Sequence, residues 1–283
     1  MKNWFWILDW SLSILTMAGN GFVIFIVCKK QRLRTKTNAF VVSLAVADFF
    51  VGMIAVPSLH FCEMASGCDS HGLLSDGIDF IRWLFVYLSA ANLCSLVLDR
   101  NIAVVKPMKY LTFMKRRRVI QMMLISWAIP TALCVFLLLL SFHSKTPLTI
   151  TIIDWLTVVL EVLLCGIVIF CFACMLRVVW KHKRSARILA KQLRFNHQVL
   201  RKTEGKSAVE MMAIVIGVFL VGYAIDLSCS FVHILNTDKP CNDRQYKLSI
   251  LVLNSAVNPL AYAIFKRDIK KEFQRLNYKN NRK

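Results

Sequence analysis

The sequence predicts an all-α membrane protein, a seven-transmembrane-helix bundle followed by a short amphipathic helix 8 on the membrane surface. Hydrophobic residues make up 57% of the 283 residues, and the mean hydropathy of +0.55 is high for a soluble chain of this length. A helix needs about 20 mainly apolar residues to cross the hydrocarbon core of a bilayer. The stretches that meet this requirement are residues 4–28, 38–61, 77–105, 119–142, 151–180, 207–235 and 246–265.

The basic residues indicate how these seven helices are oriented. Of the 36 Lys and Arg residues, 29 lie in the loops after the first and third helices and in residues 177–206 and 266–283. An odd number of spans places all four segments on one side, and basic residues mark the cytoplasmic side. We therefore expect a multi-pass membrane protein with an extracellular N-terminus and a cytoplasmic C-terminus. The net charge of +20 is therefore better explained by contact with anionic lipids of the inner leaflet than by binding of nucleic acid.

The last span is followed by a different pattern. Apolar residues recur at spacings of four, four and three, at Phe265, Ile269, Phe273 and Leu276, with Lys and Arg between them. This spacing is typical of an amphipathic helix that lies on the inner leaflet. We expect residues 1–265 to form the seven-transmembrane domain and residues 266–283 to form the amphipathic helix and a short cytoplasmic tail.

Charged residues inside the predicted spans are functional candidates, because a charge in the bilayer is costly. Asp99 and Arg100 end the third span, and Asp48 lies near the middle of the second. The alternative for Arg100 is an anchor that reaches the lipid phosphates. The alternative for Asp48 is a purely structural polar contact.

These residues and their neighbours resemble the motifs of rhodopsin-like (class A) G-protein-coupled receptors, over nearly the whole chain. The matching motifs, in order, are Gly19-Asn20, Leu44–Asp48, Asp99-Arg100-Asn101, Trp127, Phe219, Asn258-Pro259-x-x-Tyr262 and the surface helix that starts at Phe265. The chain departs from the family by lacking the usual cysteine of the third helix and the proline of the fifth. These departures and a short second outer loop indicate a weaker likeness to the melanocortin, cannabinoid, lysophospholipid and adenosine receptors.

The resemblance implies a cell-surface receptor that converts binding of an extracellular ligand into activation of a heterotrimeric G protein. Arrestin and a receptor kinase are further candidate partners. It also implies that Asp99 holds Arg100 in the inactive state and that Arg100 engages the G protein in the active state. The expected coupling and switch residues are Asp99, Arg100, Asn101, Phe219, Tyr223, Asn258, Pro259 and Tyr262. No cofactor is required, but an allosteric sodium ion is expected at Asp48, Ser89, Asn254, Ser255 and Asn258.

The ligand is less well defined. Arg82 lies 18 residues before Arg100, or about 27 Å along a helix, at the position where amine receptors carry an aspartate. Arg82 either pairs with Asp79, one helical turn away, and braces the bundle, or engages a carboxylate or phosphate. The main prediction is an anionic lipid or small acid at Arg82, and the alternative is a basic peptide or amine at Asp79 and Asp226. The expected pocket residues are His60, Asp79, Arg82, Trp83, Asp226, His233 and Tyr246.

Other classes fit the sequence less well. An opsin needs a lysine inside the seventh helix, where Val252 lies instead, and a transporter favours internal repeats. No HExxH motif or glycine-rich phosphate loop supports an enzyme. Cys62, Cys68 and Cys241 lie near the outer face, and the sequence leaves their disulfide pairing open. The other cysteines, Cys229 included, are expected to be small buried apolar residues.

Overall fold

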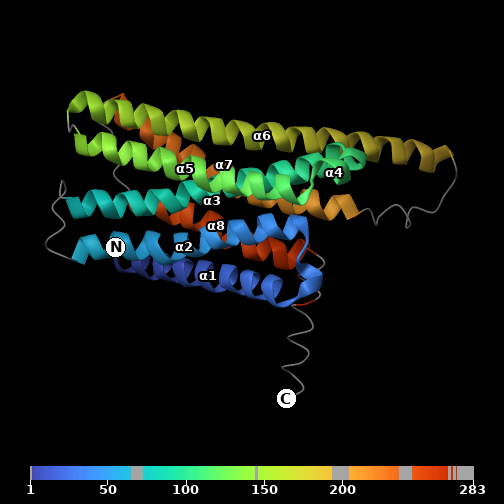
Figure 1. Ribbon diagram of the computed structural model, residues 1–283, viewed down its shortest axis with the longest axis horizontal. Coiled ribbons are helices and arrows are strands. Elements are labelled where there is room, and N and C mark those ends of the chain that lie inside the picture. Colours follow the sequence, from blue (N-terminus) through green and yellow to red (C-terminus); the bar gives the residue numbers. More distant parts are fainter. Residues whose placement is uncertain are drawn as a thin grey trace, which may run out of the picture.

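Long α-helices run side by side in one bundle in the computed structural model of the chain (Figure 1). The structure describes residues 2–64, 73–143, 146–192, 204–235, 244–266, 269 and 272, and these contain no β-strand. The helices are α1 (Lys2–Lys29), η1 (Gln31–Leu33), α2 (Lys36–Met64), α3 (Leu73–Val105), α4 (Pro107–Phe113), α5 (Arg116–His143), α6 (Pro147–Gln192), α7 (Glu204–Ile234) and α8 (Arg244–Phe265). All seven predicted spans are helices, which confirms the all-α fold class.

The bundle has the surface of a membrane protein. Six helices of the described part of the chain are long and apolar enough to cross a membrane, and a shorter apolar helix covers Ser249–Phe265. Large apolar side chains such as Leu124, Phe136 and Phe170 are exposed on α5 and α6. An exposed apolar surface of this kind suits contact with lipid and would be unfavourable in water.

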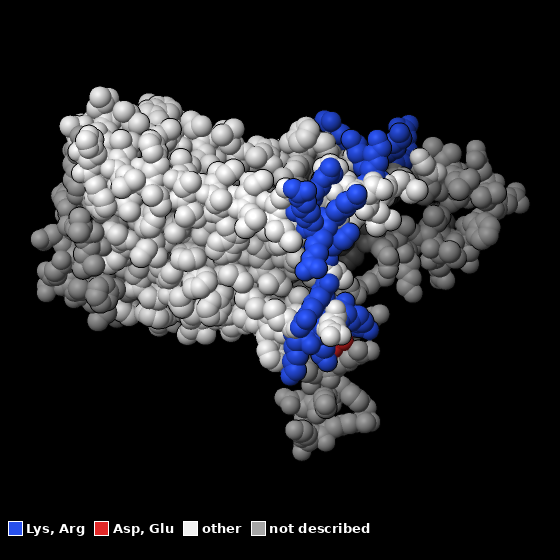
Figure 2. Space-filling view, in the orientation of Figure 1, with Lys and Arg blue, Asp and Glu red and all other residues white. Residues whose placement is uncertain are grey.

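Basic residues gather toward one end of the molecule. Figure 2 shows the Lys and Arg side chains in a band toward the end at which α4 lies, with little charge over the rest of this face. Arg32 of η1, Lys109 of α4 and Arg117 of α5 are exposed. We call this end the basic end and the opposite end the outer end.

Two helices go beyond the predicted spans. Pro107, which follows the third predicted span, is the first residue of the short helix α4. Proline suits this position because the first N–H groups of a helix have no partner within the helix. In addition, α6 has 46 residues and therefore extends about 69 Å, so it continues well beyond the predicted span 151–180.

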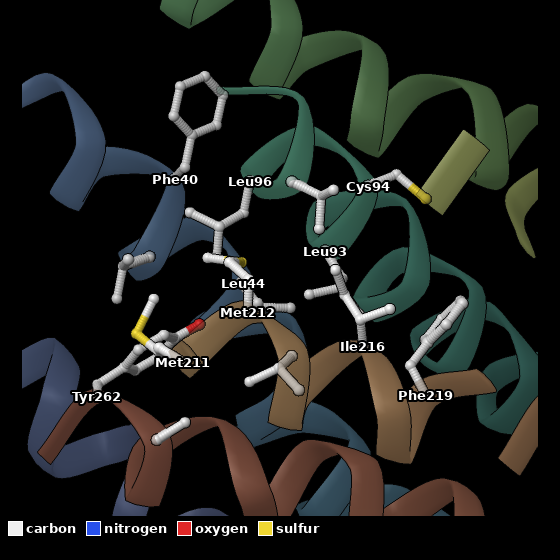
Figure 3. Close-up of a cluster of buried hydrophobic side chains, with 14 of the residues drawn as sticks. Phe40, Leu44, Leu93, Cys94, Leu96, Met211, Met212, Ile216, Phe219 and Tyr262 are labelled. Carbon is white, nitrogen blue, oxygen red and sulfur yellow. The ribbon is translucent and has the colours of Figure 1, made fainter. Parts of the chain in front are cut away.

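The core of the basic half is made by apolar side chains from several helices. Leu44 of α2, Leu93 and Leu96 of α3, and Met212 and Ile216 of α7 are all less than 2% exposed and lie together in Figure 3. Lipid tails are as apolar as these side chains, so close packing and dispersion, not exclusion of water, favour their contact. This half of the bundle is therefore held by shape complementarity.

Gly19 and Asn20 of α1 contact α8 next to Pro259. A Cβ atom on Gly19 would lie 3.0 Å from the Pro259 ring, closer than ordinary van der Waals contact, so a larger residue here would require the ring to shift. Pro259 has no N–H and leaves the carbonyl of Ser255 without its helical donor. Asn20 Nδ2 donates to that carbonyl at 3.2 Å. The donor that satisfies this carbonyl therefore comes from a different helix, α1.

Candidate functional site

The deepest polar site surrounds Asp48 of α2. The Asp48 carboxylate is fully buried. Ser89 of α3 donates to Asp48 Oδ1 at 2.5 Å, and Asn258 of α8 donates to Asp48 Oδ2 at 2.7 Å. Three helices far apart in sequence thus meet at one carboxylate, and the structure brings together three of the residues expected to bind sodium.

The other two expected ligands lie beside this carboxylate. Asn254 and Ser255 line, together with Ser89, a cavity of about 10 Å³, which is close to the smallest space that holds one water molecule. The Oδ1 atoms of Asn254 and Asn258 are buried without a hydrogen-bond partner among the described residues. A carboxylate beside neutral oxygen atoms is the donor set that hard cations prefer. The residues present therefore fit a small monovalent cation.

At the basic end, Asp99 is held by several groups at once. Arg100 Nη2 lies 2.9 Å from Asp99 Oδ2, and the Tyr110 hydroxyl donates to Asp99 Oδ1 at 2.8 Å. Thr37 of α2 donates to Asp99 Oδ2 at 3.4 Å. Burial raises the pKa of Tyr110, so its hydroxyl remains a donor at neutral pH. The sequence analysis finds Asp99 and Arg100 but misses Thr37 and Tyr110, which carry no motif.

The remaining residues expected to act in the switch lie on α3, α7 and α8. Asn101 donates from Nδ2 to the carbonyl of Cys171 in α6 at 2.6 Å. Phe219 and Tyr223 are buried on α7 with ring centroids 4.4 Å apart. Tyr262 is fully buried and lies within electrostatic range of both Asp48 and Arg100. It belongs to the same cluster of buried residues as Met211 (Figure 3). The described residues provide no hydrogen-bond partner for its hydroxyl.

Toward the outer end, Arg82 faces α2 and its own helix. Its side chain is 5% exposed, and Nη1 lies 2.7 Å from Asp79 Oδ1. Nε of Arg82 donates to Ser58 Oγ of α2 at 3.0 Å. These contacts match the interpretation in which Arg82 braces the bundle.

A cavity of about 350 Å³ lies between α3, α5 and α6 and has an acidic lining. Three carboxylates line it, Asp79 from α3 and Asp154 and Glu161 from α6, together with the aromatic rings of Trp83 and Tyr87. The described lining residues include no Lys, Arg or His, and Arg82 is not among them. We call this space the outer cavity. Its volume is within the range of small-molecule sites.

Glu161 lies at the inner part of the outer cavity. It is 3% exposed, and its Oε1 accepts a hydrogen bond of 3.1 Å from the Tyr87 hydroxyl. Asp226, buried on α7, acts electrostatically on Tyr87 together with Glu161. The sequence analysis misses Glu161 as a pocket residue, although the cost of a carboxylate inside an apolar span was a usable signal.

Other predicted pocket residues fall outside the description. The side chains of His60, His233 and Tyr246 lie outside the described residues.

Cys229 is disulfide-bonded, so its expected role as a small buried apolar residue was wrong. The described cysteines with free thiols are Cys28, Cys94, Cys134, Cys165, Cys171 and Cys174.

Comparison with known families decides the class of this bundle. Residues 19–262 match the family described as 7 transmembrane receptor (rhodopsin family). The chain belongs to this family. It is a class A G-protein-coupled receptor in the plasma membrane and not an enzyme, as the sequence analysis predicts.

Several relatives are similar to this receptor over part or most of its length. The histamine H2 receptor of Canis lupus familiaris is 26% identical over 94% of this chain and 77% of that receptor. The octopamine receptor beta-2R of Chilo suppressalis is 24% identical over 93% of this chain and 76% of that receptor. The dopamine D2-like receptor of Drosophila melanogaster is 38% identical, but over 42% of this chain and 13% of that receptor.

These findings bear on the predicted ligand. The main prediction, an anionic lipid or small acid at Arg82, finds no support, since Arg82 pairs with Asp79 and Ser58. The alternative of a cationic ligand agrees better with the carboxylates of the outer cavity. The weaker likeness to melanocortin, cannabinoid, lysophospholipid and adenosine receptors is not confirmed by the relatives given above.

Proposed function

We propose that this receptor is activated by a cationic amine that binds in the outer cavity. The observation that carries the proposal is the lining of that cavity by Asp79, Asp154 and Glu161 without a basic side chain among its described residues. The names of the relatives support it, because histamine, dopamine and octopamine are all amines. An ammonium group relieves the unfavourable burial of a carboxylate, whereas an anion would add to it.

The aromatic side chains of the cavity suit the same ligand. Trp83 and Tyr87 have ring centroids 6.0 Å apart, and both line the cavity. Aromatic faces attract cations through the ring quadrupole, most strongly where water is excluded. Carboxylates then fix the position of the ammonium nitrogen, and the rings contact the apolar part of the ligand.

Binding in this cavity is coupled to G-protein activation through a shift between two states of the bundle. In this proposal, the Asp99–Arg100 ion pair of 2.9 Å stabilises the inactive state. The agonist favours a second state in which Arg100 leaves Asp99 and engages the α-subunit of a heterotrimeric G protein. The outer end is extracellular and the basic end cytoplasmic in this proposal, with the N-terminus outside.

We also propose that a sodium ion binds at Asp48 and shifts the equilibrium between the same two states of the bundle. Asp48 would supply the charge and Ser89, Asn254, Ser255 and Asn258 the neutral oxygen atoms. The buried Oδ1 atoms of Asn254 and Asn258 support this assignment. A bound cation would balance the Asp48 carboxylate, which otherwise contacts only neutral donors in the described structure.

A G-protein activation screen tests the proposed ligand class. Membranes carrying the wild-type receptor are exposed to separate pools of amines, small carboxylic acids, anionic lysolipids and basic peptides, with receptor-free membranes as the control. We expect activation by the amine pool. Activation by the acid or lysolipid pool alone would contradict the proposal, and activation by the peptide pool alone would assign the cavity to a larger cationic ligand.

A further inference from the structure

A second space, far from the outer cavity, lies between α1, α2 and α5 near the basic end and has a volume of about 470 Å³. We call it the α2 groove, because its lining follows α2 from Thr35 to Ser43, about 12 Å along the axis. Its apolar walls come from all three helices, from Val27 of α1, Ala39 and Val42 of α2, and Met123 of α5. Polar side chains line only its ends. A groove of this kind in a membrane bundle suits an amphiphilic molecule.

Arg34 supplies positive charge at the polar end of the α2 groove. Its Nε donates to the carbonyl of Cys28 at 3.2 Å, and its Nη2 donates to the same oxygen. This carbonyl belongs to the last turn of α1, where carbonyls lack a helical donor, so the contact holds the guanidinium in place. Arginine has five N–H donors, and the described part of the chain places no carboxylate within ion-pair distance of Arg34. Donors therefore remain for an anion, and the guanidinium geometry suits a phosphate.

The first turn of α2 adds backbone donors beside Arg34. Thr35 caps the helix, since its Oγ1 accepts a hydrogen bond of 3.2 Å from the N–H of Asn38. The N–H groups of Lys36 and Thr37 have no partner within the helix. The N-terminus of a helix of 29 residues favours negative charge. Because Thr35 and Arg34 both line the groove, the guanidinium and the helix N-terminus act on the same end of it.

Asn38 indicates that the ligand also donates a hydrogen bond. Its side chain lines the groove, is 1% exposed, and donates from Nδ2 to the carbonyl of Leu33 at 2.6 Å. Its Oδ1 is buried without a hydrogen-bond partner among the described residues. A buried acceptor without a donor is unfavourable, and the phosphodiester of a lipid head group offers acceptors only. A hydroxyl on the same head group supplies the missing donor.

We propose that the α2 groove binds an anionic phospholipid whose head group carries a hydroxyl, as phosphatidylinositol does. The phosphate contacts Arg34 and the N-terminus of α2, and a head-group hydroxyl donates to Asn38 Oδ1. An acyl chain lies against Val42 and Met123. Basic pockets between membrane helices on the cytoplasmic side suit such head groups, and the basic end is cytoplasmic in the proposed orientation. The site is separate from the outer cavity, so the inference does not depend on the ligand proposed there.

Native mass spectrometry of the full-length receptor in detergent tests this inference by measuring lipid dissociation constants. The probes are phosphatidylinositol, phosphatidic acid and phosphatidylcholine with the same acyl chains, together with free inositol phosphate. The variants are Arg34→Gln, which removes the charge at the groove, and Ala39→Phe, which fills the apolar part. Arg117→Gln is the charge-matched control, because Arg117 is exposed on α5 and does not line the groove.

We expect the wild-type receptor to bind phosphatidylinositol at least tenfold more tightly than phosphatidylcholine and at least about threefold more tightly than phosphatidic acid. Arg34→Gln and Ala39→Phe each weaken phosphatidylinositol binding at least tenfold, and Arg117→Gln weakens it less than twofold.

Three results would overturn the inference. Equal binding of phosphatidylinositol and either other lipid would remove the head-group recognition. Equal losses in Arg34→Gln and Arg117→Gln would mean that the whole basic end attracts lipid without a defined site. Free inositol phosphate that binds as tightly as the lipid would assign the groove to a soluble anion. The wild-type lipid series decides the question even where a variant fails to fold, and a failed amine screen leaves it unaffected.

Discussion

The carboxylates of the basic half and those of the outer half of this receptor have different surroundings. Asp48 and Asp99 are fully buried and contact the side chains of other helices or of their own helix end. Asp79, Asp154 and Glu161 instead line a cavity large enough for a small molecule. The comparison teaches that a buried carboxylate with a complete set of donors can join helices, whereas a carboxylate on a cavity wall can select a ligand.

Replacing the switch arginine gives the largest expected effect. Arg100→Ala removes the cation that, in the proposed active state, engages the G protein. We expect agonist-stimulated nucleotide exchange to fall at least tenfold, with surface expression unchanged. Arg118→Ala is a control, because Arg118 is also basic and lies over the Phe113 ring at the same end. Full signalling by Arg100→Ala would show that Arg100 is not needed for coupling to the G protein.

The effect of sodium on thermal stability tests whether Asp48 binds a cation. A ligand present at ten times its dissociation constant stabilises the folded state by about 1.4 kcal/mol. We expect the wild-type receptor to melt a few degrees higher in sodium than in a bulky organic cation, and Asp48→Asn to melt equally in both. Thermal unfolding in detergent measures this difference. Equal melting of the wild type in the two salts would leave Asp48 as a purely structural residue.

The contact between α1 and α8 should have a smaller effect. Asn20→Ala leaves the Ser255 carbonyl without the donor that replaces the missing Pro259 N–H. Hydrogen bonds between membrane helices contribute roughly 1 kcal/mol, so we expect melting to fall by a few degrees. Ser11→Ala is the control, because Ser11 bonds only within its own helix at an exposed position. Equal melting of both variants would show that the Asn20 amide is not needed.

The smallest expected effect belongs to the ion pairs of Glu272. Its Oε1 lies 3.2 Å from Arg32 and its Oε2 3.7 Å from Lys30, whose side chains are 61% and 47% exposed. The Glu272 side chain is 6% exposed, but solvent screens both of its exposed partners, so we expect each pair to contribute less than about 1 kcal/mol. Arg32→Ala should therefore lower the unfolding free energy only slightly, and less at high salt. A loss of several kcal/mol would mean that this contact organises the basic end.

Much of the fold followed from the length of the apolar runs. Each predicted span is helical, and the motif residues Asp48, Ser89 and Asn258 meet in space. The sequence alone could not predict which residues of distant helices form hydrogen bonds with these motif residues. Thr37 reaches Asp99 across 62 residues, and nothing in its neighbourhood marks that contact.

The main ligand prediction finds no support, for a related physical reason. The position of Arg82 along α3 followed from its spacing to Arg100, but its partners depend on which helix lies opposite. Ser58 on α2 and Asp79 one turn earlier occupy the guanidinium. Glu161 was overlooked because its apolar neighbours identify a span, while the cavity beside it is formed only when α3, α5 and α6 pack together.

The central claim is that carboxylates of the outer cavity, and not Arg82, recognise the ligand. Side-by-side amine concentration–response curves for Glu161→Gln and Arg82→Gln test it most directly, with receptor number at the surface matched. Loss of a hydrogen bond to a charged group costs about 1.5–3 kcal/mol. Glu161→Gln should therefore raise the half-maximal amine concentration roughly tenfold to a hundredfold, and Arg82→Gln should leave it nearly unchanged. The reverse pattern, with Arg82→Gln abolishing the response and Glu161→Gln retaining it, would contradict the account.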